Sequence, residues 1–174
     1  CDLNTSSETS SDRTLSDVNV KRIVPVGEKE VLIATDGKGI YRMNVDSCHA
    51  VPYIVADYTI HNGMNGNNIN DVYVDGDGRI WIANYPSGIT IRDNRYGGYR
   101  WTRHSVGNRQ SLVNDQVHDV IEDSDGDLWF GTSNGISFYN SGTGEWHSFF
   151  STFDHELEDK NLSLIHISEP TRLL

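Results

Sequence analysis

The sequence has 174 residues, with 25 acidic against 14 basic side chains and a formal net charge of -11. That charge repels a phosphate backbone, so we expect no nucleic-acid partner, and no apolar run reaches the roughly 18 residues of a membrane-spanning helix. The two cysteines, Cys1 and Cys48, are too few for a disulfide framework and lack the spacing of a metal site.

Residues 1–15 are polar and rich in serine and threonine. We expect this segment to be an inter-blade loop, whose preceding blade is missing from the sequence, or a tether. A second interpretation starts from Cys1, because a mature bacterial lipoprotein begins with cysteine and continues through a tether of this composition.

Short runs that alternate apolar and polar residues predict β-strands after this segment. In chain order the runs cover residues 20–26, 30–35, 39–44, 50–55, 69–75, 79–84, 88–93, 98–103, 117–123, 127–132, 135–140 and 145–150. Turns containing aspartate and glycine separate many of them, and no window has a sustained helical period.

The runs belong to a repeat of about 48 residues. Trp129 follows Trp81 by 48 positions, and Leu32 stands 49 positions before Trp81. Four antiparallel strands per repeat of this length define a propeller blade, whose strand-two tryptophan or leucine packs between neighbouring sheets. We therefore predict an all-β fold, a β-propeller fragment of about three four-stranded blades at 16–60, 61–106 and 107–155.

Glycines mark equivalent positions in the copies, at the turns before and after the second strand. The predicted structural anchors of the repeat are Leu32, Trp81, Trp129, Gly39, Gly88, Gly135, Gly78 and Gly126. The stretch 162–172 continues no strand of the repeat and resembles the translation of an adapter used in preparing sequencing libraries. We expect residues 156–174 to be a non-native or disordered tail.

The repeated acidic residues are explained by turns. The stretches "DGDG" and "DSDGD" crowd carboxylates, but their glycines and closing positions do not match a calcium loop, whereas an Asp-Gly hairpin needs no metal. A sialidase-type box fails at its defining aspartate, where this chain has Gly76 and Ser124. The histidines stand singly, so we predict no metal, no cofactor and no catalytic residue.

Aromatic residues that do not repeat are the candidates for ligand contact. They lie in or beside the irregular loops of the second copy, next to an amide and a guanidinium group. Such a set can stack on the C–H faces of a sugar and pair with its hydroxyls, although packing at the blade edge would also explain it. The candidate ligand-binding residues are Asn84, Tyr85, Arg95, Tyr96, Tyr99 and Trp101.

The stretches "DVYVDGDGRIWIAN", "DVIEDSDGDLWFGTSNGI" and "NRQSLVNDQV" resemble the two-component regulator propeller repeat. The resemblance covers about residues 15–155, and the first copy departs from it at Leu32 and at "GEKE". It implies the periplasmic sensor of a hybrid two-component histidine kinase that binds an oligosaccharide and regulates polysaccharide utilisation. The parent protein would be a membrane-anchored homodimer carrying the kinase and the phosphorelay.

Two other functions fit a propeller. A scaffold for protein partners would capture a polypeptide and ignore sugars. A propeller glycoside hydrolase would need a pair of carboxylates about 5–9.5 Å apart, and the repeated acidic residues already have a role in turns. The resemblance favours a sensor segment that is not itself an enzyme.

Overall fold

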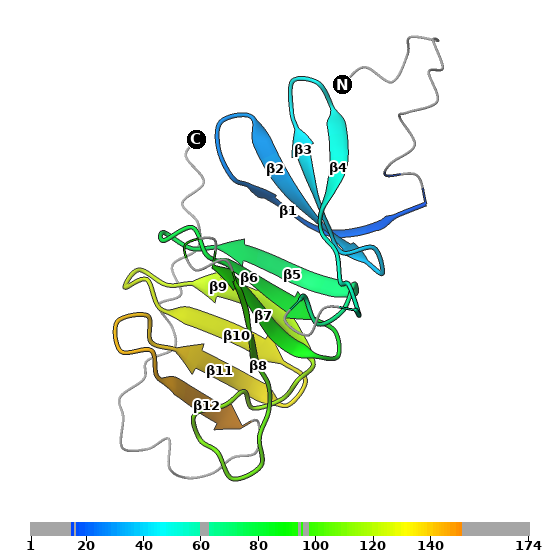
Figure 1. Ribbon diagram of the computed structural model, residues 1–174. Helices are drawn as coiled ribbons and strands as arrows, with labels where there is room; N and C mark the ends of the chain where they lie inside the picture. The colour runs from blue at the N-terminus through cyan, green and yellow to red at the C-terminus, as the bar shows by residue number, and fades with distance from the viewer. Residues whose placement is uncertain (1–14, 16, 60–62, 94, 96–97, 151–174) are drawn as a thin grey trace.

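The computed structural model describes residues 15, 17–59, 63–93, 95 and 98–150, and this part of the chain forms three four-stranded sheets (Figure 1). The predicted segments 1–15, apart from Leu15, and 156–174 lie outside the described residues. Among those residues, no helix is long and apolar enough to cross a membrane.

Each sheet is made of four strands that follow one another in the chain. Blade 1 contains β1 (Asn19–Pro25), β2 (Glu30–Asp36), β3 (Ile40–Asn44) and β4 (His49–Ile54). Blade 2 contains β5 (Ile69–Val74), β6 (Ile80–Asn84), β7 (Gly88–Asp93) and β8 (Gly98–Thr102). Blade 3 contains β9 (Val117–Glu122), β10 (Leu128–Thr132), β11 (Gly135–Tyr139) and β12 (Trp146–Phe150).

The topology is that of propeller blades. Neighbouring strands pair antiparallel in the order of the sequence, and the first strand of blade 2, β5, contacts the first strands of both neighbours, β1 and β9 (Figure 1). Each sheet thus has its first strand innermost and its fourth strand outermost. The predicted all-β class and the three four-stranded antiparallel sheets are confirmed, whereas the sequence limits assigned to each blade stay a prediction.

Apolar side chains from facing sheets form one core at each contact between blades. Between blades 1 and 2, Leu32 and Ile40 pack with Ile69, Val72 and Ile82, all nearly inaccessible to solvent. Between blades 2 and 3, Trp81 lies with its ring centroid 5.0 Å from that of Tyr139 and 5.8 Å from that of Phe130.

Trp129 occupies the equivalent position in blade 3 but has a different environment. It is half-buried and packs against Phe138 and Phe149 of its own sheet, with ring centroids 4.6 and 6.2 Å away. No sheet of the described part of the chain covers this face, which explains the difference from Trp81.

A hydrogen-bonded carboxylate fixes the tryptophan of each full repeat. In blade 2, Asp75 accepts the backbone N–H groups of Asp77 and Arg79 at 3.0 and 2.9 Å, and its other oxygen accepts the indole N–H of Trp81 at 2.8 Å. One buried side chain therefore closes the β5–β6 hairpin and orients the indole that fills the core.

The same arrangement recurs in blade 3. Asp123 accepts the N–H groups of Asp125 and Asp127, both at 3.0 Å, and the indole N–H of Trp129 at 2.7 Å. The Asp-x-Asp-Gly turn thus has a structural partner in the tryptophan, and its carboxylates need no metal.

Gly39 and Gly88 allow the turn after the second strand to pass close to the fourth strand. Both have positive φ, and an added Cβ would lie 2.5 Å from the carbonyl oxygen of Ile54 and 2.4 Å from that of Thr102, respectively. A larger residue would push the turn away from the outer strand.

The segments that lead into blades 2 and 3 each insert an apolar side chain beneath the preceding turn. Met64 joins the core between blades 1 and 2, and Leu112, 48 residues later, joins the core between blades 2 and 3. The carbonyl of Asn67 accepts the N–H groups of Gly37 and Gly39, both at 3.0 Å, which anchors this lead-in segment to the previous blade.

The inner strands carry one charged residue at an equivalent register, namely Arg22, Asp71 and Asp119. Asp71 is buried, accepts the backbone N–H of Val120 in blade 3 at 2.9 Å, and lies 3.3 Å from Arg22 Nε of blade 1. Burial, together with a hydrogen bond to the Asp119 carboxyl group, raises the pKa of Asp71 to about 6. A single carboxyl group therefore contacts all three blades.

The first prediction concerns the carboxylate under each tryptophan. We expect Asp75→Ala to lower the free energy of unfolding by about 2–4 kcal/mol, because it leaves a buried indole N–H and two hairpin N–H groups without their acceptor. Asp123→Ala should cost clearly less, since Trp129 is half-exposed and water can replace the lost acceptor. Urea unfolding followed by tryptophan fluorescence measures both, and equal losses would contradict the assigned roles.

The second prediction concerns pH. The folded-state pKa of Asp71, about 6, lies above its ordinary value of 3.8, so the folded protein holds this proton more tightly than the unfolded chain does. The resulting stabilisation is complete below about pH 4 and is lost as pH rises through about 6. We expect the stability of Asp71→Asn relative to the wild type to rise by about 2 kcal/mol between pH 4.5 and 7.5.

Urea midpoints of the two proteins across that pH range provide the measurement. The comparison between proteins removes the contributions of the other carboxylates, which titrate in both. Parallel pH profiles for the wild type and Asp71→Asn would show that Asp71 does not hold the proton.

Candidate ligand-binding site

A polar stripe, defined as Asn84, Thr90 and Arg92, lies on the face of blade 2 that packs against blade 1. Ile80 and Ile82 of this face belong to the core shared with blade 1, and they pair with Arg92 and Thr90, respectively. Directly paired residues of antiparallel strands share a face, and Asn84 follows Ile82 by two positions on the same strand. The stripe therefore lies within the contact between the two blades.

Three side-chain atoms of the stripe are buried and have no hydrogen-bond partner among the residues that the structure describes. Within the described part of the chain, the buried side-chain atoms lacking a hydrogen bond are Asn84 Oδ1, Thr90 Oγ1 and Arg92 Nη1. Two are acceptors, of which the threonine hydroxyl can also donate, and one is a charged donor. Buried polar groups are nearly always paired, so such a concentration on one face marks this face as unusual.

Two aromatic residues of β8 flank the stripe. Trp101 pairs with Thr90 and Tyr99 pairs with Arg92, so both rings belong to the face that meets blade 1. Trp101 is 46% exposed, and its indole N–H donates to the carbonyl of Gly63 at 2.9 Å. Its ring is thus held in place by a hydrogen bond while nearly half of its surface stays open to solvent.

Blade 1 contributes a third aromatic ring, that of Tyr53, to the contact between blades 1 and 2, which we call the seam. The guanidinium carbon of Arg92 lies 4.6 Å from the ring centre of Tyr53, and that of Arg42 lies 5.5 Å from it. Arg42 also pairs with Glu30 of its own blade, which raises the pKa of the Arg42 guanidinium. Tyr53 and Arg92 therefore join the two blades by a cation–π contact.

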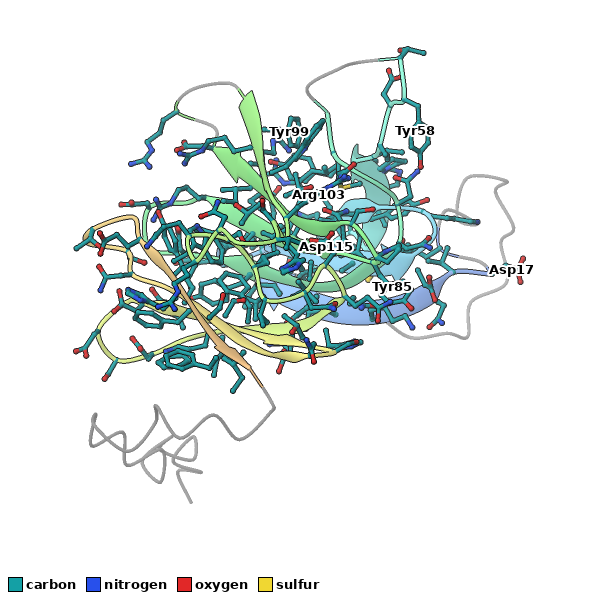
Figure 2. All side chains as sticks on the ribbon, turned by 90° about the horizontal axis from the view of Figure 1, so that it is seen from below. Asp17, Tyr58, Tyr85, Tyr99, Arg103 and Asp115 are labelled. Carbon is teal, nitrogen blue, oxygen red and sulfur yellow. The ribbon has the colours of Figure 1, made fainter. Side chains whose placement is uncertain are left out.

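The structure separates the predicted ligand-binding residues into groups. Asn84, Tyr99 and Trp101 share the face toward blade 1, whereas Tyr85 lies in the turn after β6, away from Tyr99 (Figure 2). Arg95 lies beyond the other end of β7 and pairs with Asp93, and its hydrogen bonds hold the pKa of Asp93 below the usual range. Tyr96 lies outside the described residues.

Sequence reasoning did not select Thr90, Arg92 or Tyr53. The available signal was the run "GITIRD", in which Thr90 and Arg92 alternate with isoleucines. Such alternation is typical of a sheet with one solvated face, but both faces of a central blade are covered. Polar residues on one face of a strand that is covered on both faces therefore indicate that this face is special.

The groups gathered here can make noncovalent contacts with a ligand. Over the residues that the structure describes, no group of three histidine, cysteine, aspartate or glutamate side chains is placed to hold a metal ion. The seam offers aromatic faces, neutral hydrogen-bonding oxygens and the guanidinium groups of Arg42 and Arg92. These are the elements of a site for a polar, uncharged or weakly acidic ligand with C–H faces.

Comparison with solved structures shows a likeness of fold to β-propellers. The extracellular domain of the hybrid two component system BT3049 of B. thetaiotaomicron superposes with a TM-score of 0.68 at 20% identity, covering 84% of this chain and 20% of that one. The extracellular domain of BT4673, from the same organism, gives 0.56 at 22% identity, covering 75% and 18%. PorZ, a surface component of the type-IX secretion system of Porphyromonas gingivalis, gives 0.53 at 15%, covering 77% and 20%.

The chain thus spans about a fifth of the length of each of these structures. Comparison with curated proteins found no match. Residues 63–85 and 111–134 match the two component regulator propeller family. These two segments run from the lead-in residues beside Met64 and Leu112 to the end of the second strand, and they contain the hydrogen-bonded aspartate and tryptophan. The chain therefore contains two-component regulator propeller repeats in blades 2 and 3 of its three four-stranded blades.

Proposed function

We propose that this chain is a ligand-sensing segment of the extracytoplasmic propeller of a hybrid two-component sensor histidine kinase. The observation that carries the proposal is the match of residues 63–85 and 111–134 to the regulator propeller family. The likeness of fold to the extracellular domains of BT3049 and BT4673 supports it. The proposed location is the periplasm.

We further propose that the ligand is an oligosaccharide and that it binds at the seam between blades 1 and 2. The exposed ring of Trp101 can stack on the C–H face of a sugar, which is the usual aromatic contact of carbohydrate sites. Tyr99 and Asn84 share that face of the blade. Tyr85, 41% exposed in the adjoining turn, can extend the contact to a second sugar unit.

Signalling would follow from differential binding. A ligand that spans two blades favours the arrangement in which those blades are correctly spaced, and it shifts the equilibrium by the difference between its affinities for the two states. In the proposed parent protein this shift biases the paired kinase across the membrane and so regulates polysaccharide utilisation. The chain itself performs recognition and no turnover.

The third prediction tests recognition. Isothermal titration of the chain with a panel of plant and host oligosaccharides should give saturable heat for at least one of them, with no product by chromatography. In Trp101→Ala the affinity for that sugar should fall about tenfold, because a stacking ring is lost. Trp101→Phe keeps a ring without the N–H to Gly63 and should retain most of the affinity.

Tyr58→Ala is the matched control, since Tyr58 is an aromatic residue that is 82% exposed and lies outside the seam. It should bind like the wild type. Release of shortened sugars would instead indicate a hydrolase. If no sugar of the panel binds, or if Trp101→Ala and Tyr58→Ala lose the same affinity, the result argues against a sugar site at this seam.

A further inference from the structure

Blade 2 differs from its neighbours in how its buried hydroxyl and amide groups are paired. At the end of the second strand, Asn84 stands where blade 1 has Thr35 and blade 3 has Thr132. Thr35 donates its hydroxyl to the carbonyl of Gly39 at 2.6 Å, and Thr132 donates to that of Gly135 at 2.8 Å. Asn84 instead donates Nδ2 to the carbonyl of Gly66 at 2.9 Å and leaves Oδ1 without a donor.

The third strand shows the same contrast. Ser137 of blade 3 is fully buried, and its hydroxyl accepts the backbone N–H of Val113 at 2.9 Å. Thr90 is the equivalent residue of blade 2 and is also fully buried, but its hydroxyl has no partner. Two equivalent positions are thus satisfied in blade 3 and unsatisfied in blade 2.

The chain also differs between blades 2 and 3 next to these positions. The turn after β6 has one residue more than the turn after β10, since Asn84 and Gly88 correspond to Thr132 and Gly135. The lead-in segment of blade 2 bonds to this longer turn, because Asn65 Nδ2 donates to the carbonyl of Ser87 at 3.1 Å. Asn65 corresponds to Val113, but it bonds to blade 2 through its side-chain Nδ2, whereas Val113 bonds to Ser137 through its backbone N–H.

The two unpaired oxygens belong to diagonal neighbours on one face of adjacent strands. Asn84 pairs with Gly88, and Thr90 lies two positions further along the same strand and on the same face. Diagonal neighbours of this kind are separated by about 7–8 Å at the backbone and less at the side chains. One oxygen atom that makes two hydrogen bonds of about 2.8 Å can bridge two side-chain oxygens that lie about 4.5–5.5 Å apart.

We propose that a hydroxyl-bearing guest binds between Asn84 Oδ1 and Thr90 Oγ1. The bond from Asn84 Nδ2 to Gly66 fixes the amide so that Oδ1 can only accept, and the guest must therefore donate to it. The Thr90 hydroxyl can either donate or accept. A group that both donates and accepts, O–H, fits this pair, whereas a carboxylate cannot donate and a metal ion lacks charged ligands here.

Two sources can supply this hydroxyl. One is a buried water molecule that is a permanent part of blade 2, since such waters bind where two or more polar groups lack partners. The other is a hydroxyl group of the sugar, which reaches the site beside the ring of Trp101 when ligand binds. The first source is independent of the proposed function, and the second rests on it.

The test is the Thr90→Val variant, which removes the hydroxyl and keeps the shape of the side chain. If the guest is a resident water, the variant loses bonds that the wild type makes, and the folding equilibrium constant should fall about fivefold. If the position is empty in the free protein, replacing an unpaired buried hydroxyl by a methyl group should raise that constant. Whether Thr90→Val lowers or raises the folding equilibrium constant therefore shows whether the position is occupied in the free protein.

Two matched variants accompany it. Thr90→Ser keeps the hydroxyl and should preserve whatever the site binds. Ser137→Ala removes the equivalent, paired hydroxyl of blade 3 and should destabilise the protein, because the N–H of Val113 loses its acceptor. A crystal structure of the chain at high resolution, free and with a bound sugar, shows directly whether an oxygen lies between Asn84 and Thr90.

The outcomes separate the sources. Density in the free protein together with destabilisation by Thr90→Val supports the water. Density only in the sugar complex, with sugar affinity reduced at least fivefold in Thr90→Val but not in Thr90→Ser, supports the sugar hydroxyl. A more stable Thr90→Val with no density in either crystal, or with unchanged sugar affinity, overturns the proposal. If no sugar binds, the stability of Thr90→Val and the density in the free protein decide whether the guest is a resident water or the proposal is wrong.

Discussion

The arrangement of blades 2 and 3 depends on the contacts that the indole of Trp81 makes. Its ring contacts Phe130, Tyr139 and Trp146 of the next sheet, and its N–H is held by Asp75. The aspartate orients the ring, and the ring in turn sets where the next sheet can pack. Because a buried N–H without an acceptor is costly, the turn and the core of a blade are energetically one unit.

The three blades show what the repeat holds constant and what it changes. The innermost strands, the hairpin carboxylates of blades 2 and 3, and the apolar lead-in residues Met64 and Leu112 keep their roles. Blade 2 departs from the pattern at Asn84, at Thr90 and in its longer turn, and it is also the blade that exposes Trp101 and Tyr85. The features that repeat in the blades build the scaffold, and the features in which blade 2 differs form the candidate site.

Much of this fold can be predicted from the sequence, because each strand alternates side chains between two covered faces and ends at a recognisable turn. The strands observed in the described residues match the predicted runs to within a residue or two at most ends. Periodicity could not reveal that Asp75 and Asp123 bond to the indoles, because a hairpin turn alone explains an aspartate before glycine. It also could not reveal which predicted site residues meet. Asn84 and Trp101 share a face because of the register in which their strands pair with β7, whereas Arg95 pairs with Asp93 beyond the end of β7. The pairing register is a property of the folded sheet and cannot be read from periodicity.

The position of the strand-two side chain has a consequence for how such a chain folds during synthesis. Leu32 is covered by blade 2 and Trp81 by blade 3, so each blade completes its apolar contacts only when the sheet after it has formed. A ribosome that delivers blades one at a time therefore always presents one sheet with an uncovered anchor, as Trp129 is here. Each new blade would then fold against the exposed apolar face of the blade before it. Until that blade has formed, a chaperone could bind the exposed apolar face.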